Sequence, residues 1–281
     1  MPHFQESFGL VQLRSASALI RASAIRGSQD NMHDLIEQAA DTLSHARRLV
    51  VLTGAGMSKE SGIPTFREAQ EGLWSRYDPQ RLATLQGFLA NPKLVWDWYQ
   101  YRLGLIENAR PNSGHLAIAE LEQRLPRTVV ITQNIDGLHS QAGNQDVMEL
   151  HGSIRRYKCL RGHTSIAQAD LVGQDVTPPL CPRPGCTAMV RPDVVWFGET
   201  LDPNIIHRAY AEAESCDVML IVGTSGVVQP AASLPYQAWN ARARIIEINP
   251  TPSELTDLAH IYLQGPAGEI LPRVVNEIPA K

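Results

Sequence analysis

The chain has 281 residues, of which 43% are hydrophobic and 19% are charged, and its formal net charge is −4 with a sequence pI near 6.1. This length can bury a large core, either as one sizeable domain or as one domain with a small insert. The slightly acidic balance argues against a nucleic-acid-binding surface as the main function, and no apolar run reaches the roughly 18–20 residues that a membrane span needs.

Residues 1–31 differ in composition from the rest of the chain. Between residues 7 and 29 there are several serines and alanines, no acidic residue, and the arginines Arg14, Arg21 and Arg26. This composition is typical of a mitochondrial transit peptide, and Met32 could then serve as an alternative start. Glu6 does not fit that pattern, so a disordered tail is the alternative interpretation. We expect a mitochondrial location, with cytoplasm or nucleus as the alternative, and one folded domain over residues 32–281.

Hydrophobic patterning after the tail predicts strands that alternate with helices. An amphipathic helix is expected from Asn31 to Arg47, and the apolar run 48–53 that follows is typical of a buried parallel strand. Further helices are expected to begin at the N-cap pair Asn91-Pro92 and at Ser113. Further strands are expected over residues 128–133, 147–150, 216–222 and 244–248. This alternation predicts an α/β fold with a Rossmann-type, doubly wound parallel sheet.

Residues 152–192 interrupt the alternation. They are rich in glycine, proline, cysteine and arginine and show little periodicity. We interpret this segment as a small module that is inserted into the α/β domain.

The most informative stretch runs from Gly54 to Arg67, directly after the first predicted strand. A strand that enters a Gly-x-Gly turn lets the backbone approach a pyrophosphate. The dinucleotide fingerprint of dehydrogenases, however, has a third glycine where Lys59 stands here. Gly62-Ile63-Pro64 then ends any helix and starts a loop that carries Phe66 and Arg67. We expect this loop to cover a bound nucleotide.

Polar residues follow the second predicted strand, in the run Thr132-Gln133-Asn134-Ile135-Asp136. Open α/β sheets bind ligands at the carboxyl ends of their strands. Amide and carboxylate side chains at that edge can satisfy a carboxamide such as that of nicotinamide. The alternative is an ordinary strand-to-helix turn in which Asn134 and Asp136 act as caps.

Two more strand ends carry candidate residues. His151 and Gly152 follow the short strand that ends at Leu150, and a neutral imidazole there is a suitable base near pH 7. Gly223-Thr224-Ser225 ends a strongly apolar strand, where small residues suit a backbone that wraps a ribose or phosphate. Asn249 ends the next strand in a similar way. Ordinary turn chemistry is the alternative for these last residues.

Taken together, the run from Gly54 to Arg67 and the Gln-Asn-Ile-Asp motif resemble the sirtuins, the NAD-dependent protein-lysine deacylases, over about residues 33–275. The resemblance implies NAD as cofactor and His151 and Asn134 as catalytic residues, with His151 accepting a proton from the NAD ribose. It implies NAD contacts at Gly54, Ala55, Gly56, Ser58, Thr65, Phe66, Arg67, Gln133, Asn134, Ile135, Asp136, Gly223, Thr224, Ser225, Asn249 and, in the run Gln264-Gly265-Pro266-Ala267, Ala267.

The run from Val194 to Glu199 resembles the sirtuin segment that pairs with a substrate peptide as a strand. Main-chain pairing gives affinity with little sequence preference. The resemblance therefore implies substrate contacts at Val195, Gly198 and Glu199. A buried apolar strand is the alternative, which explains the valines but not the Phe-Gly-Glu ending.

The acyl preference is expected to depend on Tyr99 and Arg102. These residues are three apart on a predicted helix and therefore share a face. Arginine can bind a carboxylate through two parallel hydrogen bonds, and the tyrosine hydroxyl adds a donor. The pair matches the Tyr-x-x-Arg pair of class III sirtuins, which remove succinyl, malonyl and glutaryl groups, and Ala83 matches a small residue that enlarges their acyl pocket. A surface arginine on an amphipathic helix is the alternative.

The cysteines predict a metal site in the insert. Four cysteines are too few for a disulfide framework, so we expect a reducing compartment. Cys181 and Cys186 have a spacing typical of metal ligands, and Cys159 precedes them. Sirtuins carry two close pairs of cysteines, but Gly162 stands where the partner of Cys159 would be. His163 follows and would complete a zinc site of three cysteines and one histidine, whereas a lost site is the alternative.

We therefore expect a class III sirtuin-like deacylase with a zinc-ribbon-like insert. The resemblance implies that the acyl group passes from lysine to the NAD ribose, giving free lysine, nicotinamide and O-acyl-ADP-ribose. Its partners would be proteins with acylated lysines, with no direct contact to nucleic acid or membrane, and we expect a monomer. The alternatives are an NAD-dependent deacetylase, an ADP-ribosyltransferase and a non-catalytic reader of acylated lysine.

Overall fold

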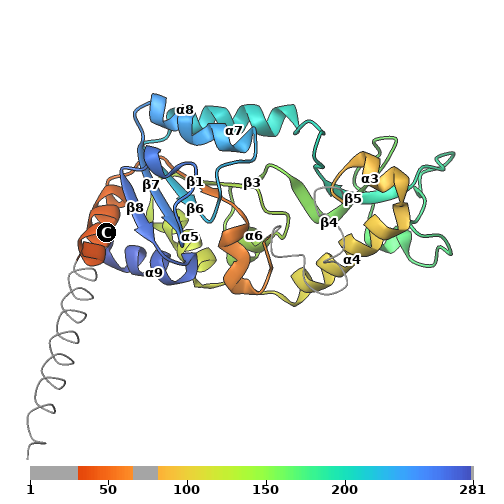
Figure 1. The fold of residues 1–281 in the computed structure, drawn as a ribbon, viewed down its shortest axis with the longest axis horizontal. Coiled ribbons are helices and arrows are strands. Elements are labelled where there is room, and N and C mark those ends of the chain that lie inside the picture. The colour runs from red at the N-terminus through yellow and green to blue at the C-terminus, as the bar shows by residue number, and fades with distance from the viewer. Residues whose placement is uncertain (1–30, 66–81, 280–281) are drawn as a thin grey trace, which may run out of the picture.

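The computed structural model describes residues 31–65 and 82–279 of the chain (Figure 1). The predicted transit peptide, and the predicted cover loop with Phe66 and Arg67, lie outside these residues, so both stay predictions. Within the described part, no helix combines the length and apolar character that crossing a bilayer requires.

A six-stranded parallel sheet forms the centre of the larger lobe, in the order β3-β2-β1-β6-β7-β8. Most of its side chains are buried and apolar, which explains the continuous apolar runs in the sequence. The strand order reverses between β1 and β6, and such a switch point opens a crevice at the carboxyl ends of the strands. The strands are β1 (Leu49–Thr53), β2 (Thr128–Thr132), β3 (Val147–Glu149), β6 (Val218–Val222), β7 (Arg244–Asn249) and β8 (Ile261–Gln264).

Helices cover both faces of this sheet, as Figure 1 shows. A helix over residues 31–44, α5 (Ser113–Arg124) and α9 (Ala267–Glu277) pack on one face, around Leu43, Leu121 and Leu271. Two helices, α7 (Pro203–Ser215) and α8 (Leu234–Asn240), pack on the other. The predicted doubly wound α/β fold is therefore confirmed.

A smaller lobe lies beyond the carboxyl ends of the strands, at the right of Figure 1. It contains an antiparallel pair, β4 (Gly152–Cys159) and β5 (Val190–Val194). Two helices from an earlier part of the chain, α3 (Leu85–Ala90) and α4 (Pro92–Asn108), share a core with this pair. The insert predicted at residues 152–192 is thus only one of the two segments that build the lobe.

The predicted helix starts agree with the structure. The Asn91 side chain accepts a hydrogen bond from the backbone N–H of Leu94, and Pro92 occupies the first turn of α4. Asn112 caps α5 in the same way. The remaining short helices are η1 (Ala55–Ser61), α6 (Leu138–Ala142), η3 (Gln168–Leu171), η4 (Ala231–Ser233) and η5 (Thr256–Leu258).

Candidate active site

The loops that follow β1 and β6 pack backbone against backbone at the switch point. Gly54 N–H donates to the carbonyl of Val222 at 3.0 Å, and Gly56 N–H donates to the carbonyl of Gly223 at 2.8 Å. A Cβ atom at Gly223 would lie 2.3 Å from the backbone nitrogen of Met57, and one at Gly54 would lie 2.8 Å from the carbonyl oxygen of Gly223. Glycine is required here because any side chain would force the two loops apart.

The predicted Gln-Asn-Ile-Asp motif lies directly beneath the glycine loop. The amide of Asn134 donates to the carbonyl of Gly54 and to Oγ of Ser58, both at 3.1 Å. Ser58 Oγ in turn donates to Asp136 Oδ2 at 2.8 Å, and Leu138 N–H donates to Asp136 Oδ1. Burial raises the pKa of Asp136, while the hydrogen bonds from Leu138 and Ser58 act against that rise. The motif therefore connects β2 to the loop after β1 and is more than a turn cap.

His115 and His139 belong to the same buried network, although the motifs did not reveal them. His139 Nε2 lies 3.0 Å from Thr53 Oγ1, and the two imidazole rings are 4.8 Å apart. Burial lowers the pKa of His115 to about 3, with His139 adding to the effect, and burial lowers the pKa of His139 to about 4. Both rings are therefore neutral near pH 7. The one available signal was the place of His115 just after the helix start predicted at Ser113, whereas the short helix that carries His139 was not predicted.

His151 follows β3 and is held in one tautomer. Its Nδ1 lies 2.9 Å from the carbonyl oxygen of Gln133, which can only accept, so Nδ1 carries the proton and Nε2 is left as an acceptor. Burial lowers the pKa of His151, partly offset by this hydrogen bond. A Cβ atom at Gly152 would lie 2.1 Å from the carbonyl oxygen of Asp193, so the next residue must be glycine. The arrangement suits a neutral base.

Further predicted NAD residues meet at the ends of β6 and β7. The Gln133 amide donates to Thr224 Oγ1 at 3.0 Å, and the Asn249 amide donates to the Thr224 carbonyl at 3.0 Å. A second hydrogen bond, at 2.7 Å, joins Asn249 Nδ2 to the buried Glu247 Oε1. Residues from three strand ends thus form one edge, and their individual contacts to NAD stay predictions.

The other predicted NAD residues differ in their surroundings. Ala55 and Ser225 are exposed, whereas Ala267 is buried at the start of α9. Ile135 accepts a backbone hydrogen bond from Ile154 of β4 and so joins the two lobes. Thr65 is the last described residue before the segment with Phe66 and Arg67.

Tyr99 and Arg102 lie in the smaller lobe, on the face of α4 that packs into its core. Tyr99 is 2% exposed, and its hydroxyl oxygen accepts a hydrogen bond of 2.8 Å from the indole Nε1 of Trp196. Burial raises the pKa of Tyr99 to about 12, so the phenol is neutral. The Arg102 guanidinium lies 5.2 Å from the ring centroid of Trp98, and its Nε and Nη1 atoms are buried.

The loop after β5 connects the smaller lobe to the sheet edge. Val195 N–H donates to the carbonyl of His151 at 2.9 Å, and Phe197 N–H donates to the carbonyl of Ala83 at 2.9 Å. Glu199 forms a bidentate ion pair with Arg191, at 2.5 and 2.7 Å. The Glu199 carboxylate thus has a partner within the chain, and its predicted contact to substrate stays a prediction, as do those of Val195 and Gly198.

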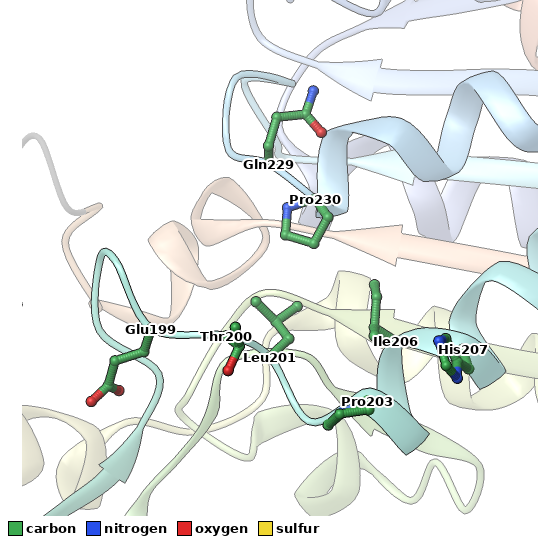
Figure 2. A pocket seen from close by; sticks show the side chains of 8 residues that line it. All are labelled: Glu199, Thr200, Leu201, Pro203, Ile206, His207, Gln229 and Pro230. Atoms are coloured by element: carbon green, nitrogen blue, oxygen red, sulfur yellow. The ribbon is translucent and has the colours of Figure 1, made fainter.

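A cavity of about 440 Å³ adjoins this loop, and the sequence did not indicate it (Figure 2). Figure 2 shows Leu201 and Ile206 below Pro230, which directly precedes η4. Its lining is mainly apolar and consists of Glu199, Thr200, Leu201, Pro203, Ile206, His207, Gln229 and Pro230.

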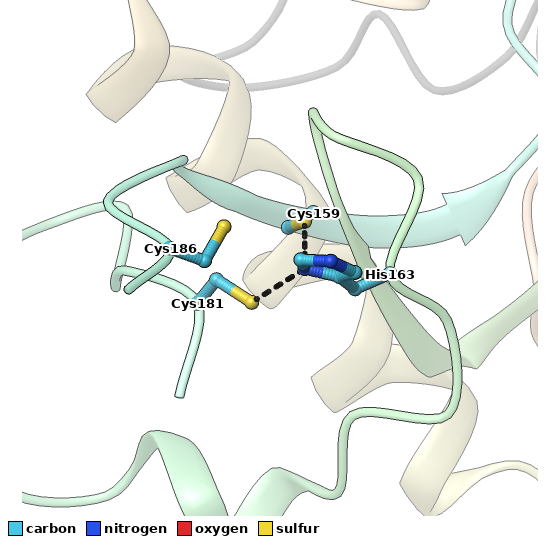
Figure 3. A group of neighbouring side chains, drawn as sticks. All are labelled: Cys159, His163, Cys181 and Cys186. Atoms are coloured by element: carbon cyan, nitrogen blue, oxygen red, sulfur yellow. Dashed lines mark hydrogen bonds between the residues drawn. The ribbon is translucent and has the colours of Figure 1, made fainter. Parts of the chain in front are cut away.

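The predicted metal ligands come together at the far end of the smaller lobe (Figure 3). The ligand atoms of Cys159, His163, Cys181 and Cys186 all lie within 4.8 Å of one another. His163 Nδ1 is 3.4 Å from the sulfur atoms of both Cys159 and Cys181. Tetrahedral zinc bound by sulfur and nitrogen at its usual bond lengths separates those two atoms by about 3.5 Å. The cluster is therefore consistent with a structural zinc site, and His163 takes the place of the missing cysteine.

The chain is similar to proteins of one family. The Sir2 family model matches residues 54–230. NAD-dependent protein deacylase 2 of Pyrobaculum aerophilum is 52% identical over 239 residues, which cover 85% of this chain and 94% of that protein. NAD-dependent protein deacylase 1 of Pseudomonas aeruginosa is 46% identical over 242 residues, which cover 84% of this chain and 96% of that protein.

Solved structures agree with these relatives. The crystal structure of a Sir2 homologue in complex with NAD is 44% identical with a TM-score of 0.79, over 86% of this chain and 93% of that one. A Sir2 complex with a p53 peptide and NAD⁺ is 31% identical with a TM-score of 0.75, over 84% and 95% of the two chains. With a matching sheet edge, a Cys₃His cluster and relatives of this identity, the chain belongs to the Sir2 family, the NAD-dependent protein deacylases.

Proposed function

We propose that this protein removes acyl groups that end in a carboxylate, namely succinyl, malonyl and glutaryl, from lysine side chains of other proteins, and acetyl groups only weakly. The observation that carries the proposal is that Tyr99 is buried and that Nε and Nη1 of Arg102, three residues later on α4, are buried as well. Proteins with acylated lysines are the proposed partners, since Sir2 proteins have been solved with a p53 peptide and with a myristoylated histone peptide.

The proposal depends on charge complementarity within a mostly apolar lobe. Burial lowers the pKa of Arg102, while Tyr99 and Asp136 act against that shift, and arginine stays protonated in proteins. A buried cation is favoured when an anion binds beside it. A terminal carboxylate accepts from the guanidinium and from a neutral phenol, whereas an acetyl group has no such acceptor. Ala83, which is 5% exposed, leaves more room than a larger side chain would.

The sheet edge supplies the catalytic groups for the proposed reaction. NAD, when bound, supplies the ADP-ribose that receives the acyl group, with nicotinamide as the leaving group. Nε2 of His151 is the unprotonated nitrogen and accepts a proton from a ribose hydroxyl. Asn134 is held by hydrogen bonds to Gly54 and Ser58, and we propose it as the second catalytic residue. Each turnover consumes one NAD and one water and gives lysine, nicotinamide and O-acyl-ADP-ribose.

The test compares one peptide carrying either succinyl-lysine or acetyl-lysine, with mass spectrometry and nicotinamide release as readouts. We expect the wild type to prefer the succinyl peptide. Arg102→Met should raise KM for the succinyl peptide by about 10- to 150-fold, the range for hydrogen bonds to a charged group. Deacetylation should stay nearly intact.

Lys93→Met is the matched control, because it removes a cation from the exposed side of the same helix, where Lys93 pairs with Asp97. It should leave both activities unchanged. Equal losses on both peptides in Arg102→Met would show that the arginine supports the fold. A wild type that prefers acetyl-lysine would overturn the proposed acyl class.

A further inference from the structure

The side chain of Trp196 links the loop after β5 to Tyr99, which we propose to contact the acyl group. Its indole Nε1 lies 2.8 Å from the hydroxyl oxygen of Tyr99, and both side chains are almost fully buried. An indole N–H can only donate, so the direction of this hydrogen bond is unambiguous and the Tyr99 oxygen is the acceptor. Trp196 and Tyr99 are 97 residues apart in the chain.

This hydrogen bond determines what the Tyr99 hydroxyl can do next. A phenol has one proton, and among the described residues the hydroxyl has no partner other than the indole. With one lone pair occupied by the indole N–H, the proton is directed to the other side of the oxygen. An oxygen that already accepts a hydrogen bond is also a better donor, because consecutive hydrogen bonds polarise one another.

Trp196 also contacts three other residues, which hold its indole in place. The Arg191 guanidinium carbon lies 3.4 Å from the centroid of its ring, and Phe88 packs against the indole at a centroid distance of 5.3 Å. The backbone N–H of Trp196 donates to Glu199 Oε2 at 2.9 Å, and Glu199 pairs with Arg191. The indole therefore presents its N–H to Tyr99 from a fixed position.

We infer that Trp196 is a positioning residue for acyl selectivity, which holds the Tyr99 hydroxyl as a donor toward the carboxylate end of the acyl group. The inference rests on the proposed preference for such acyl groups. Trp196 does not touch the acyl group in this scheme but acts through Tyr99. Without the indole N–H, the hydroxyl proton of Tyr99 can rotate toward other acceptors. The hydroxyl oxygen is then no longer polarised, and the hydroxyl becomes a weaker donor.

The test is Trp196→Phe, which keeps an aromatic ring against Arg191 and Phe88 and removes only the N–H and part of the indole. We expect KM for the succinyl peptide to rise about 3- to 10-fold, the range for one neutral hydrogen bond, while kcat stays the same. Parameters for the acetyl peptide should not change. In a Tyr99→Phe background, Trp196→Phe should cause no further loss, because the hydroxyl through which it acts is gone.

Trp96→Phe is the matched control, since Trp96 lies on the same helix as Tyr99 but packs against Tyr157 on the side of the metal cluster. It should leave the ratio of the two activities unchanged. Equal losses of Trp196→Phe on both peptides, or full additivity with Tyr99→Phe, would overturn the inference while the proposed function stands. A wild type without a succinyl preference would overturn both.

Discussion

The sheet edge and the smaller lobe contribute to one site but are held together in different ways. At the sheet edge, the loops after β1 and β6 touch through glycine backbones, and short polar side chains such as Asn134 and Ser58 fill the space beneath them. These elements rest on a parallel sheet that is buried on both faces. The geometry of the sheet edge is therefore set mainly by contacts between backbone segments.

The smaller lobe has no comparable sheet, since β4 and β5 form a single antiparallel pair. Its shape depends on large side chains, among them Trp98, Tyr99 and Trp196, and on the Cys₃His cluster at its far end. A two-stranded pair is marginally stable without such support. We therefore expect changes in the smaller lobe to affect folding or acyl selectivity, whereas changes of catalytic groups at the sheet edge should affect mainly turnover.

The largest expected effect comes from removing the metal. Structural zinc sites contribute about 10–16 kcal/mol of apparent binding free energy in small zinc-binding peptides, so a strong chelator should unfold much of the smaller lobe. Purified protein should contain about one zinc per chain, the number that one tetrahedral cluster holds. After chelation, hydrogen exchange should accelerate in β4 and β5 far more than in β1, β2 and β6.

Cys216 provides a matched control for this experiment. It is a buried cysteine at the end of α7, in the larger lobe, and burial raises the pKa of its thiol to about 12. Cys216→Ala should keep the zinc, whereas Cys181→Ala should lose it. Zinc-free wild-type protein with an intact smaller lobe would contradict the interpretation of the cluster as a structural site.

The next largest effect should come from His151. His151→Ala removes the unprotonated Nε2, and general acid–base contributions are about 10²- to 10⁴-fold, so turnover on either peptide should fall by that factor. Because burial lowers the pKa of His151, the acid limb of the wild-type pH profile should lie below pH 6.5. Full activity of His151→Ala would exclude it as the base. Thermal melting of the variant serves as the control for folding.

The smallest expected effect is a difference between the two regions in how the free energy of unfolding depends on pH. His115 and His139 have pKa values of about 3 and about 4 when folded, against an ordinary value of 6.5, so the unfolded chain binds more protons below pH 6.5. Their contribution to stability is complete above pH 6.5 and falls on acidification, with a slope of about 1.4 kcal/mol per pH unit for each histidine.

In the smaller lobe the sensitive group is Glu199. Burial raises the pKa of its carboxyl, but Arg191 outweighs that effect and the net pKa is lowered from 4.5. Its contribution is therefore present above pH 4.5 and is lost only in stronger acid. The free energy of unfolding in urea should fall between pH 7 and pH 5 because of the two histidines at the sheet edge. His139→Asn should make this fall shallower. A flat profile in both proteins would contradict this assignment.

Local sequence patterns were sufficient to predict the fold class of the larger lobe and five strands of its sheet, but they did not predict β8. Strands of buried apolar residues are continuous in the sequence, and the glycines that must approach another backbone, such as Gly54 and Gly56, lie at the strand end where the run predicted them. The strand-end motif Gln133–Asp136 lies at the sheet edge for the same reason, because the carboxyl ends of parallel strands share one edge. The cluster of Cys159, His163, Cys181 and Cys186 could also be predicted, since ligand spacing is a local property.

The sequence did not indicate which distant segments share the smaller lobe. Residues 152–192 stood out by composition, but the helices α3 and α4, which complete the core around Trp98, belong to an ordinary helical pattern. The indole that contacts Tyr99 lies 97 residues away from it, and the carboxylate of Glu199 faces Arg191 across a turn. Such partners depend on how side chains of separate elements meet in space, which neither hydrophobic period nor motif spacing encodes. Local patterns therefore predicted most of the sheet, the edge that carries the strand-end motifs and the cysteine–histidine cluster, whereas packing between elements determined the surroundings of Tyr99.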